Sequence, residues 1–348
     1  MFQDISLEDW RSLKDRAGVT TIDVRSPSEY KLATIPGSLN IPLFNDEERA
    51  EVGTLYKQTS IEAAKERGLE IVSAKLPSFI KEFSKIPGNK TVFCWRGGMR
   101  SKTTATVLSL MGIRSYRLTG GYRTYRQWVV DQLDTLTFHP NLFVLQGHTG
   151  CGKTEILHKL KEKGVPVLDL EGMAGHRGSI FGGIGLESHN QKMFDSLLLE
   201  EILTMQNSRY ITIEAESRRV GKVVLPDLVM NKKENGVFIR IELPLEERVR
   251  QILQDYRPWE HPEACSQAFK RIKARIHTPI AHEIQTSLDA GKYEVAVEML
   301  LRYYYDPRYA HSFHQYDNED SYFVKAATAL EAFHQVEQIL EQHQQNLR

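Results

Sequence analysis

Several features that would place a chain in a special class are missing from this sequence. No apolar run approaches the roughly 20 residues that a membrane-spanning helix needs, and residues 1–4 have neither the basic nor the apolar region of a secretory signal. We therefore expect a cytoplasmic protein with no membrane partner. Charge of one sign is not in excess, since 45 Lys and Arg balance 45 Asp and Glu. Zero net charge argues against nonspecific polyanion binding but is compatible with a local basic face.

Cysteine is also scarce. The chain of 348 residues has only Cys94, Cys151 and Cys265, which lie far apart and form neither a CxxC pair nor a zinc spacing. An odd number of separated cysteines does not predict a disulfide framework. Each thiol must therefore be judged by its neighbours.

The length and the order of the apolar runs predict two α/β domains. At roughly 150 residues per domain, we expect one domain over 1–133, a linker at 134–141 and a second domain over 142–348. Strands that alternate with helices are typical of a parallel sheet with helical cover. In the first domain we predict strands at 20–24, 91–94 and near Tyr116, two helical stretches within 61–85, and helices over 101–111 and through Trp128.

The second domain repeats this alternation and ends in a mostly helical part. We predict strands at 142–145, 165–170, 210–214 and 237–243, and helices at 153–163 and about 187–205. The last segment places one apolar face on an amphipathic helix. That face consists of Leu330, Phe333, Val336, Ile339 and Leu340.

A first candidate site surrounds Cys94, where a buried strand ends and a loop leads into a helix. Gly97 and Gly98 allow backbone N–H groups to converge on an anion, and Ser101 lies at the start of the helix. Arg96 and Arg100 add positive charge, which together with the helix N-terminus favours a nucleophilic thiolate. The alternative is a buried structural cysteine.

This loop resembles the rhodanese family. The resemblance also includes residues 23–30 and 35–42, and it extends over about residues 5–133. It implies that Cys94 carries sulfur as a persulfide. Arg100 lies six positions after Cys94, one more than an ordinary sulfurtransferase loop has. That spacing is similar to cysteine-dependent phosphatases, whose larger cradle suits a tetrahedral phosphate-like ligand.

A second candidate site is a phosphate loop at 147–154, with the sequence GHTGCGKT. It follows a predicted strand and precedes a predicted helix, which is the context that the GxxxxGK[ST] motif requires. Gly147, Gly150 and Gly152 let N–H groups face phosphate oxygens, Lys153 reaches the outer phosphate, and the Thr154 hydroxyl can bind Mg²⁺. We expect Cys151 to supply only a small side chain.

A carboxylate at the end of the predicted strand 210–214 is the second candidate ligand for Mg²⁺. Glu214 could orient the ion or a water molecule there, although Asp is the usual residue at this position in phosphate-loop proteins. The alternative interpretation is a capping or salt-bridged glutamate.

Basic residues in three segments are candidates for phosphate or tRNA contacts. Residues 114–128 hold four arginines and four aromatic residues, the types that grip phosphates and stack on exposed bases. Solvated surface charge, or aromatic rings of the core, would explain the same pattern. The candidates are Arg123, Arg126, His176, Arg177, Arg218 and Arg219.

As a whole, the chain resembles the tRNA 2-selenouridine synthase family. The resemblance rests on both loops and on residues 52–57, 170–179 and 213–219. It implies a rhodanese-like parallel-sheet domain, followed by a P-loop NTPase-like α/β domain with a helical C-terminal part. It also implies exchange of sulfur for selenium at C2 of wobble 2-thiouridine in tRNA, with geranyl diphosphate and selenophosphate as co-substrates. An enzyme that produces selenophosphate would then be a possible partner.

The residues are compatible with this chemistry. Alkylation of the sulfur by a prenyl group activates C2, and the departing diphosphate needs a cradle such as the phosphate loop with Lys153, Thr154 and Mg²⁺. No DDxxD metal-binding motif of ordinary prenyltransferases is present to take this role. Cys94 would attack the selenium of selenophosphate and become loaded with selenium, while Arg96, Arg100 and the loop amides hold the phosphate.

Two other interpretations remain open at this point. In one, the phosphate loop hydrolyses ATP to activate the substrate carbonyl, and Cys94 delivers sulfur to tRNA as a persulfide. In the other, the chain is a non-catalytic nucleotide-sensing scaffold whose Cys94 loop only docks an anion.

Overall fold

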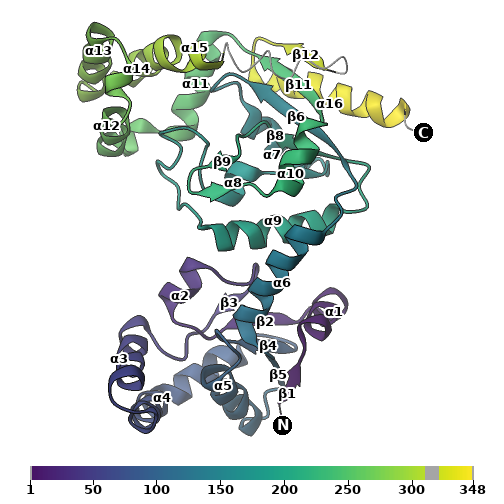
Figure 1. Ribbon diagram of the computed structural model, residues 1–348, viewed down its shortest axis with the longest axis vertical. Helices are drawn as coiled ribbons and strands as arrows, with labels where there is room; N and C mark the ends of the chain where they lie inside the picture. Colours follow the sequence, from purple (N-terminus) through teal and green to yellow (C-terminus); the bar gives the residue numbers. More distant parts are fainter. Residues whose placement is uncertain (1, 310–320, 347–348) are drawn as a thin grey trace. The chain divides into compact units, whose positions relative to one another are not determined.

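Two separate parallel sheets organise the chain (Figure 1). The computed structural model describes residues 2–309 and 321–346. These residues divide into two units, of which the first reaches to Thr135 and includes Asp195–Leu197, and the second holds the remainder. Both sheets carry helices between their strands, which confirms the predicted α/β class.

The first sheet has the strand order β1-β5-β4-β2-β3, and all its strand pairs are parallel. Its strands are β1 (Gln3–Ile5), β2 (Thr20–Asp23), β3 (Leu39–Asn40), β4 (Lys90–Phe93) and β5 (Ser115–Leu118). Every residue of the central strand β4 is buried, as expected for a parallel strand covered on both faces. The carboxyl end of β4 delivers the chain directly to Cys94.

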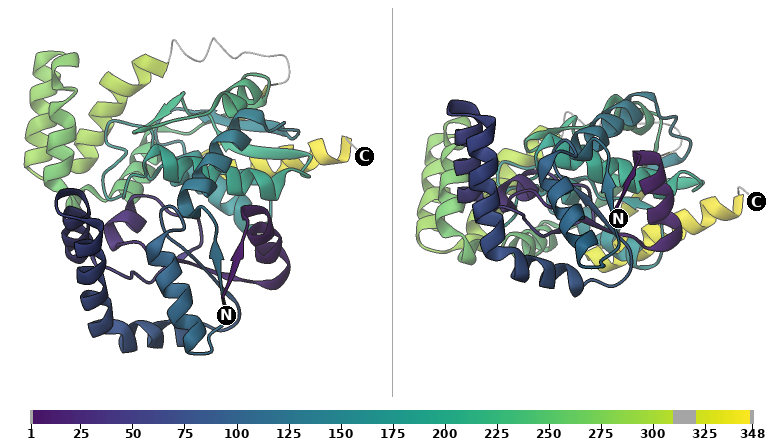
Figure 2. Two further views of the ribbon diagram at one scale, coloured as in Figure 1. Left: turned by 60° about the horizontal axis from the view of Figure 1, so that its bottom comes forward. Right: turned by 90° about the horizontal axis from the view of Figure 1, so that it is seen from below.

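Six helices belong to the first unit: α1 (Leu7–Ala17), α2 (Pro27–Leu32), α3 (Asp46–Gln58), α4 (Ile61–Ser84), α5 (Met99–Leu110) and α6 (Gly121–Thr135). In the views of Figure 2, α3 and α4 lie side by side. The prediction of two helical stretches within 61–85 was wrong, because α4 continues through Pro77. A proline normally kinks or interrupts a helix, but Val72 before it and Phe79 and Phe83 after it are buried in the same core, so packing on both sides of Pro77 stabilises the helix.

The second sheet has the order β12-β11-β6-β8-β7 and is also parallel. Its strands are β6 (Asn141–Gly147), β7 (Val167–Leu168), β8 (Tyr210–Glu214), β11 (Val237–Glu242) and β12 (Tyr322–Lys325), and a two-stranded antiparallel ribbon is formed by β9 (Arg219–Val220) and β10 (Val223–Val224). β7 is shorter than the predicted strand 165–170. The edge strand β12 was not predicted, since only one of its four residues is buried.

The remaining α-helices are α7 (Lys153–Glu162), α8 (Leu170–Ala174), α9 (Gln191–Met205), α10 (Asp227–Glu234), α11 (Leu245–Tyr256), α12 (Pro262–Lys270), α13 (Thr278–Asp289), α14 (Tyr293–Leu300), α15 (Asp306–Tyr309) and α16 (Ala329–Asn346). All of them belong to the second unit except for residues Asp195–Leu197 of α9. Figure 1 shows α12, α13 and α14 as one helical group, and they share a core of their own. The predicted apolar face of α16 is only partly correct. Phe333, Val336 and Leu340 are buried in the sheet core, whereas Leu330 is 51% exposed. Within the described residues, no helix is long and apolar enough to cross a membrane.

Candidate active site

Cys94 lies at the carboxyl end of β4, where its side chain is only 3% exposed. It packs with Val24 and Val92 of the first core. Its Sγ lies 3.2 Å from the hydroxyl oxygen of Ser101, which belongs to the first turn of α5. The strand and the helix therefore bring together the thiol and the hydroxyl that the sequence places seven residues apart.

The loop after Cys94 is held in place by the start of α6. The N–H of Tyr122 donates to the carbonyl of Cys94, and the N–H of Arg123 donates to the carbonyl of Trp95, both at 2.9 Å. Gly121 has a φ of 60°, and a Cβ there would lie 2.2 Å from the Cys94 carbonyl oxygen, so only glycine allows this approach.

This arrangement leaves donors free in the loop. Among the described residues, the N–H groups of Arg96, Gly97 and Gly98 find no hydrogen-bond acceptor. Gly97 has a φ of 63°, which turns the backbone at this point. Free N–H groups at a helix N-terminus form an anion-binding concavity. The loop therefore has three backbone donors available for an anion, and the anion nest around Cys94 stays a prediction.

The two arginines of the loop differ in their surroundings. Arg96 is exposed and, with Arg123, lines a shallow hollow of about 480 Å³. Arg100 donates to both carboxylate oxygens of Glu29 at 2.5 and 3.2 Å. Burial alone would lower the pKa of Arg100, but the hydrogen bonds and charge of Glu29, with a contribution from Cys94, raise it.

Glu29 is a site residue that the sequence analysis did not identify. It lies in the first turn of α2 and accepts from the N–H of Ser26 at 3.2 Å, in the reciprocal cap that joins Ser26 to Glu29. The spacing of a capping box was therefore visible in the sequence. The pairing of Glu29 with Arg100 was not visible in the sequence, because the two residues are 71 positions apart.

The phosphate loop connects β6 to α7, as predicted. Gly150 and Gly152 have φ values of 81° and 76°. A Cβ on Gly147 would lie 2.5 Å from the sulfur of Cys151, which is itself buried in the core. Lys153 Nζ lies 3.3 Å from the Gly147 carbonyl oxygen. The loop lines a cavity of about 610 Å³, together with Arg177, Tyr256 and Arg308.

Glu171 is the carboxylate that contacts Thr154 of the phosphate loop, and Glu214 contacts the backbone of Glu171. Thr154 donates its hydroxyl to Glu171 Oε2 at 3.1 Å, and the backbone N–H of Glu171 donates to Glu214 Oε1 at 2.7 Å. Burial and the charge of Glu216 raise the pKa of Glu171 to about 8, against the opposing effect of Lys153. Glu214 is 2% exposed, and burial followed by the charges of Asp169 and Glu171 raises its pKa well above the usual range.

These residues fit a divalent cation. Glu214 Oε2 is buried and finds no hydrogen-bond partner among the described residues, so the cluster has an oxygen atom that its protein neighbours do not satisfy. The Thr154 hydroxyl and the Glu171 carboxylate are oxygen ligands of the kind that Mg²⁺ prefers. Within the part of the chain that the structure describes, no three His, Cys, Asp or Glu side chains form a ready cage. Mg²⁺ usually binds through one or two carboxylates plus substrate phosphates, and so does not need such a cage.

A buried arginine that the sequence analysis missed supports the phosphate loop. Arg248 of α11 donates to the Thr149 carbonyl at 2.9 Å and to both carboxylate oxygens of Asp306 at 2.6 and 3.0 Å. Burial would raise the pKa of Asp306, but hydrogen bonds from His148 and Arg248 outweigh it and lower the pKa to about 2. No local motif signals this support, because Arg248 lies 99 residues after the loop residue it holds.

The other predicted basic residues of the second unit have different surroundings and do not form one cluster. Arg177 lines the phosphate cavity, where it donates to the carbonyls of Ile184 and Asp255 and lies 4.8 Å from the centre of the Tyr256 ring. His176 is half buried, which lowers its pKa. Arg218 pairs with Asp227 at 2.6 Å and is exposed, like Arg219.

The basic and aromatic segment of the first unit is mainly structural. Tyr116, Tyr122 and Tyr125 are buried, so they cannot stack on exposed bases. Arg126 pairs with Asp195 at 2.6 Å. In this segment Arg123 is exposed, and it shares its hollow with Arg96 of the Cys94 loop.

Comparisons with known proteins match both units. Residues 6–127 match the family model described as rhodanese-like domain, and residues 140–278 match that of the tRNA 2-selenouridine synthase AAA domain. A protein of Nitrosomonas europaea named tRNA 2-selenouridine synthase is 39% identical over 261 residues, which are 73% of this chain and 67% of that protein. Proteins of the same name from Bdellovibrio bacteriovorus and Aeromonas salmonicida are each 31% identical, over 84% of this chain and 88% and 86% of theirs.

Proposed function

Because this chain belongs to the tRNA 2-selenouridine synthase family, we propose that it converts 2-thiouridine at the wobble position of tRNA into 2-selenouridine. The proposed route passes through an S-geranylated nucleoside, with geranyl diphosphate and selenophosphate as co-substrates. One observation carries the proposal: a single chain holds a thiol within a nest of free amides and a separate phosphate loop with its own carboxylates. The route has two steps, the transfer of the geranyl group and the exchange of sulfur for selenium. Each of them requires a cradle for a phosphorus-containing group.

The first step belongs to the phosphate loop. The nucleoside sulfur attacks C1 of the geranyl group, the C1–O bond breaks, diphosphate leaves, and the proton at N3 is lost. The loop amides and Lys153 hold the diphosphate and stabilise the negative charge that develops on it. When bound, Mg²⁺ supplies further neutralisation of the diphosphate, and Thr154 and Glu171 are the residues that would hold it.

The second step belongs to Cys94. Attack of its thiolate on selenium would leave the P–Se electron pair on phosphorus and release phosphite, so we place the attack on phosphorus instead. Selenide then leaves with the electron pair, and the cysteinyl phosphate is hydrolysed to phosphate and thiolate. Selenide attacks C2 of the geranylated nucleoside, the C2–S bond breaks, and geranyl thiolate departs and takes up a proton. No oxidant or reductant is needed.

The geometry of the Cys94 loop supports attack on phosphorus. The N–H groups of Arg96, Gly97 and Gly98 are available for the phosphoryl oxygens, and the charge of Arg100 lies near the sulfur. A loop with six positions from cysteine to arginine suits a tetrahedral group. Arg96 and Arg123 face one hollow beside the loop and could contact the tRNA backbone there.

The test supplies purified protein with 2-thiouridine tRNA and each donor separately, and analyses the nucleosides by mass spectrometry. Cys94→Ser should form the geranylated nucleoside and lose selenation on the order of 10³-fold or more, as expected when a nucleophile is removed. Lys153→Ala should reduce geranylation on the order of 10²-fold, because a donor to the leaving group is lost.

Two controls match these variants. Cys265→Ser removes a cysteine that is equally buried but lies in α12, and Lys161→Ala removes a lysine that is 52% exposed on α7. Both should behave as the wild type. Normal selenouridine from Cys94→Ser, or steady ATP turnover stimulated by tRNA without any need for the prenyl donor, would contradict the proposed function.

A further inference from the structure

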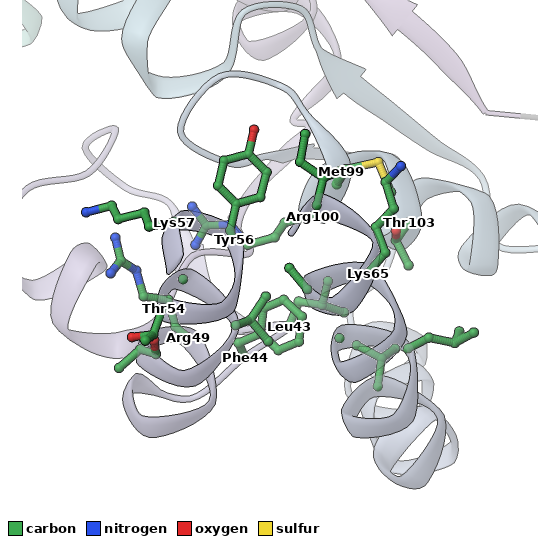
Figure 3. A pocket seen from close by; sticks show the side chains of 18 of the residues that line it. Leu43, Phe44, Arg49, Thr54, Tyr56, Lys57, Lys65, Met99, Arg100 and Thr103 are labelled. Carbon is green, nitrogen blue, oxygen red and sulfur yellow. The ribbon is translucent and has the colours of Figure 1, made fainter. Parts of the chain in front are cut away.

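A large apolar groove lies beside the Cys94 loop and has no role in the two steps described so far. It has a volume of about 1000 Å³ and is lined by α3, α4, the first turns of α5 and the segment before α3 (Figure 3). Leu43 and Phe44 lie between the two helices in this view. The other apolar lining residues are Ala50, Val52, Ile61, Ala64, Leu69, Val72 and Met99.

The groove exposes several large apolar side chains to water. Leu69 is 70% exposed, Met99 62%, Tyr56 59% and Ile61 45%. A contiguous apolar surface of this kind is typical of a binding site. Burial of Ala64, Val72, Leu43 and Phe44 at its floor gives it a fixed shape.

The groove is connected to Cys94 through packing and charge. Cys94, Leu43 and Phe44 belong to one core cluster. Met99, Arg100 and Thr103 of α5 line the groove, and this helix begins five residues after Cys94. The charge of Cys94 also contributes to the raised pKa of Arg100. A ligand in the groove would therefore lie next to the reacting loop.

The rim of the groove has an excess of positive charge. Arg49, Lys57, Lys65 and Arg100 line it, and none of the described lining residues is a carboxylate. Glu29, which does not line the groove, pairs with Arg49 and Arg100, so one carboxylate stands against four cations. Figure 3 shows Arg49 and Lys57 on one side and Lys65 on the other. An apolar floor with a cationic rim is complementary to a hydrocarbon chain that is joined to a polyanion.

We propose that this groove holds the prenyl chain of the S-prenylated nucleoside while selenium replaces the thioether at C2. The inference rests on the proposed function, in which the chain is attached to the sulfur that departs. The reacting C2–S bond must then reach the Cys94 loop, so the chain has to lie within a few bonds of it. The groove removes the chain from water, and its cationic rim faces the phosphates of the tRNA.

This placement assigns the prenyl group a second role beyond activation of C2. The chain identifies which tRNA has completed the first step, since unmodified 2-thiouridine has nothing to place in the groove. A hydrocarbon site of this kind gains discrimination with each additional carbon that it buries. The selenium step should therefore depend on the length of the alkyl group.

The experiment bypasses the first step by using synthetic anticodon stem-loop RNA that already carries the alkylated nucleoside. One RNA carries S-geranyl-2-thiouridine and the other S-methyl-2-thiouridine, and selenouridine formation from selenophosphate is followed by mass spectrometry. The wild type should convert the geranyl RNA at least about 10-fold faster than the methyl RNA. Leu69→Glu places a charge in the groove at an exposed position and should abolish most of this preference.

Leu110→Glu is the matched control. Leu110 is 80% exposed at the end of α5 and does not line the groove, so this variant should keep the preference. Binding gives a second readout: in a Cys94→Ser background, fluorescence anisotropy should show tighter binding of the geranyl RNA than of the methyl RNA. The Leu69→Glu change should remove that difference.

The outcomes separate this inference from the proposed function. If the wild type converts neither RNA, the proposed function is wrong. If the wild type converts both RNAs at the same rate, or if Leu69→Glu keeps the preference of the wild type in rate and in binding, the groove does not hold the chain. If Leu110→Glu loses the preference as fully as Leu69→Glu does, the assignment to this groove is also overturned.

Discussion

Burial alone does not distinguish Cys94 from the other two thiols of the chain. All three cysteines are buried. Burial raises the pKa of Cys265, and Cys151 packs into the core beneath the phosphate loop. Cys94 differs because free backbone donors and an arginine surround it. Its chemistry therefore comes from the loop in which it lies.

The identity of the covalent intermediate tests the role of Cys94. We expect incubation with selenophosphate alone to give a phosphoryl adduct on Cys94, because attack on phosphorus releases selenide without any change of oxidation state. High-resolution mass spectrometry of the peptide separates this adduct from a selenium adduct by the isotope pattern of selenium. Cys265→Ser should form the adduct normally. A selenium pattern on Cys94 would show that attack occurs on selenium instead.

Asp306 gives a prediction for the dependence of stability on pH. Its pKa of about 2 in the folded protein is below the unfolded value near 3.8, so its ionisation stabilises the fold above pH 4. This contribution is lost as the pH falls toward 2. We expect Asp306→Asn to lower the free energy of unfolding by about 1–2 kcal/mol at pH 7, after allowance for its partial exposure.

Denaturant titrations of the wild type and Asp306→Asn at several pH values measure this difference. The gap between the two proteins should shrink steadily below pH 4. Because Asp306 pairs with Arg248, which holds the Thr149 carbonyl, the variant should also bind diphosphate more weakly at pH 7. A gap that stays constant down to pH 2 would contradict the assignment of the low pKa to the Arg248 and His148 contacts.

The same local arrangement occurs once in each unit. A buried strand, β4 or β6, ends in a glycine-containing loop that leads into a helix, α5 or α7. In both, glycines with positive φ let backbone donors face an anion. The two loops can thus bind phosphorus-containing groups by the same physics. Each loop contains a cysteine, but Cys151 packs into the core beneath the phosphate loop, whereas Cys94 lies beside the free backbone donors of its loop.

Gly121 allows a test of this arrangement at the level of an element. A Cβ there would lie 2.2 Å from the Cys94 carbonyl, so Gly121→Ala should push the loop away from α6. Gly112→Ala is the control, because Gly112 has a similar φ of 71° but no atom within 4 Å of the added carbon. Both variants should lose about 1 kcal/mol from backbone strain, and Gly121→Ala should lose a further 1–3 kcal/mol.

Selenation separates the two glycine variants more clearly than stability does. We expect Gly121→Ala to lose selenation on the order of 10²-fold, since displaced amides no longer stabilise the phosphoryl group. Gly112→Ala should retain it. Thermal unfolding and selenation of preformed S-geranyl RNA measure both effects. Equal selenation by the two variants would mean that the clamp between α6 and the loop does not position the amides.

Much of this fold could be predicted from the sequence, since strands such as β4 and β8 are short apolar runs and the phosphate loop has a local motif. What could not be predicted depends on distant partners. The carboxylate of Glu29 reaches Arg100 over 71 positions, and Arg248 reaches Thr149 over 99. Glu171 lies in the segment 170–179 that carries the family resemblance, but only the folded chain shows that it, rather than Glu214, contacts Thr154. Local patterns identify the loops, whereas tertiary packing decides which distant side chains contact the residues of these loops.

For the whole molecule, the division of labour between the units leads to a complementation experiment. Cys94→Ser keeps the phosphate loop, and Lys153→Ala keeps the Cys94 loop. The geranylated nucleoside is a thioether that is stable in water, so it can leave one molecule and bind to another. Neither variant alone should make selenouridine from 2-thiouridine tRNA at an appreciable rate. A mixture of the two should restore it, with a rate that rises with the concentration of the Lys153→Ala protein.

This complementation depends on chemistry rather than on the placement of the two units. If each step is complete within its own unit, the mixture works whenever the intermediate tRNA exchanges between molecules. The groove variant Leu69→Glu, combined with Lys153→Ala, should complement Cys94→Ser about 10-fold more slowly, because it no longer binds the prenyl chain in the groove. Leu110→Glu combined with Lys153→Ala should complement fully. If the simple mixture gives the geranylated nucleoside but no selenouridine at any protein concentration, the two steps require a single intact chain, and the intermediate does not exchange.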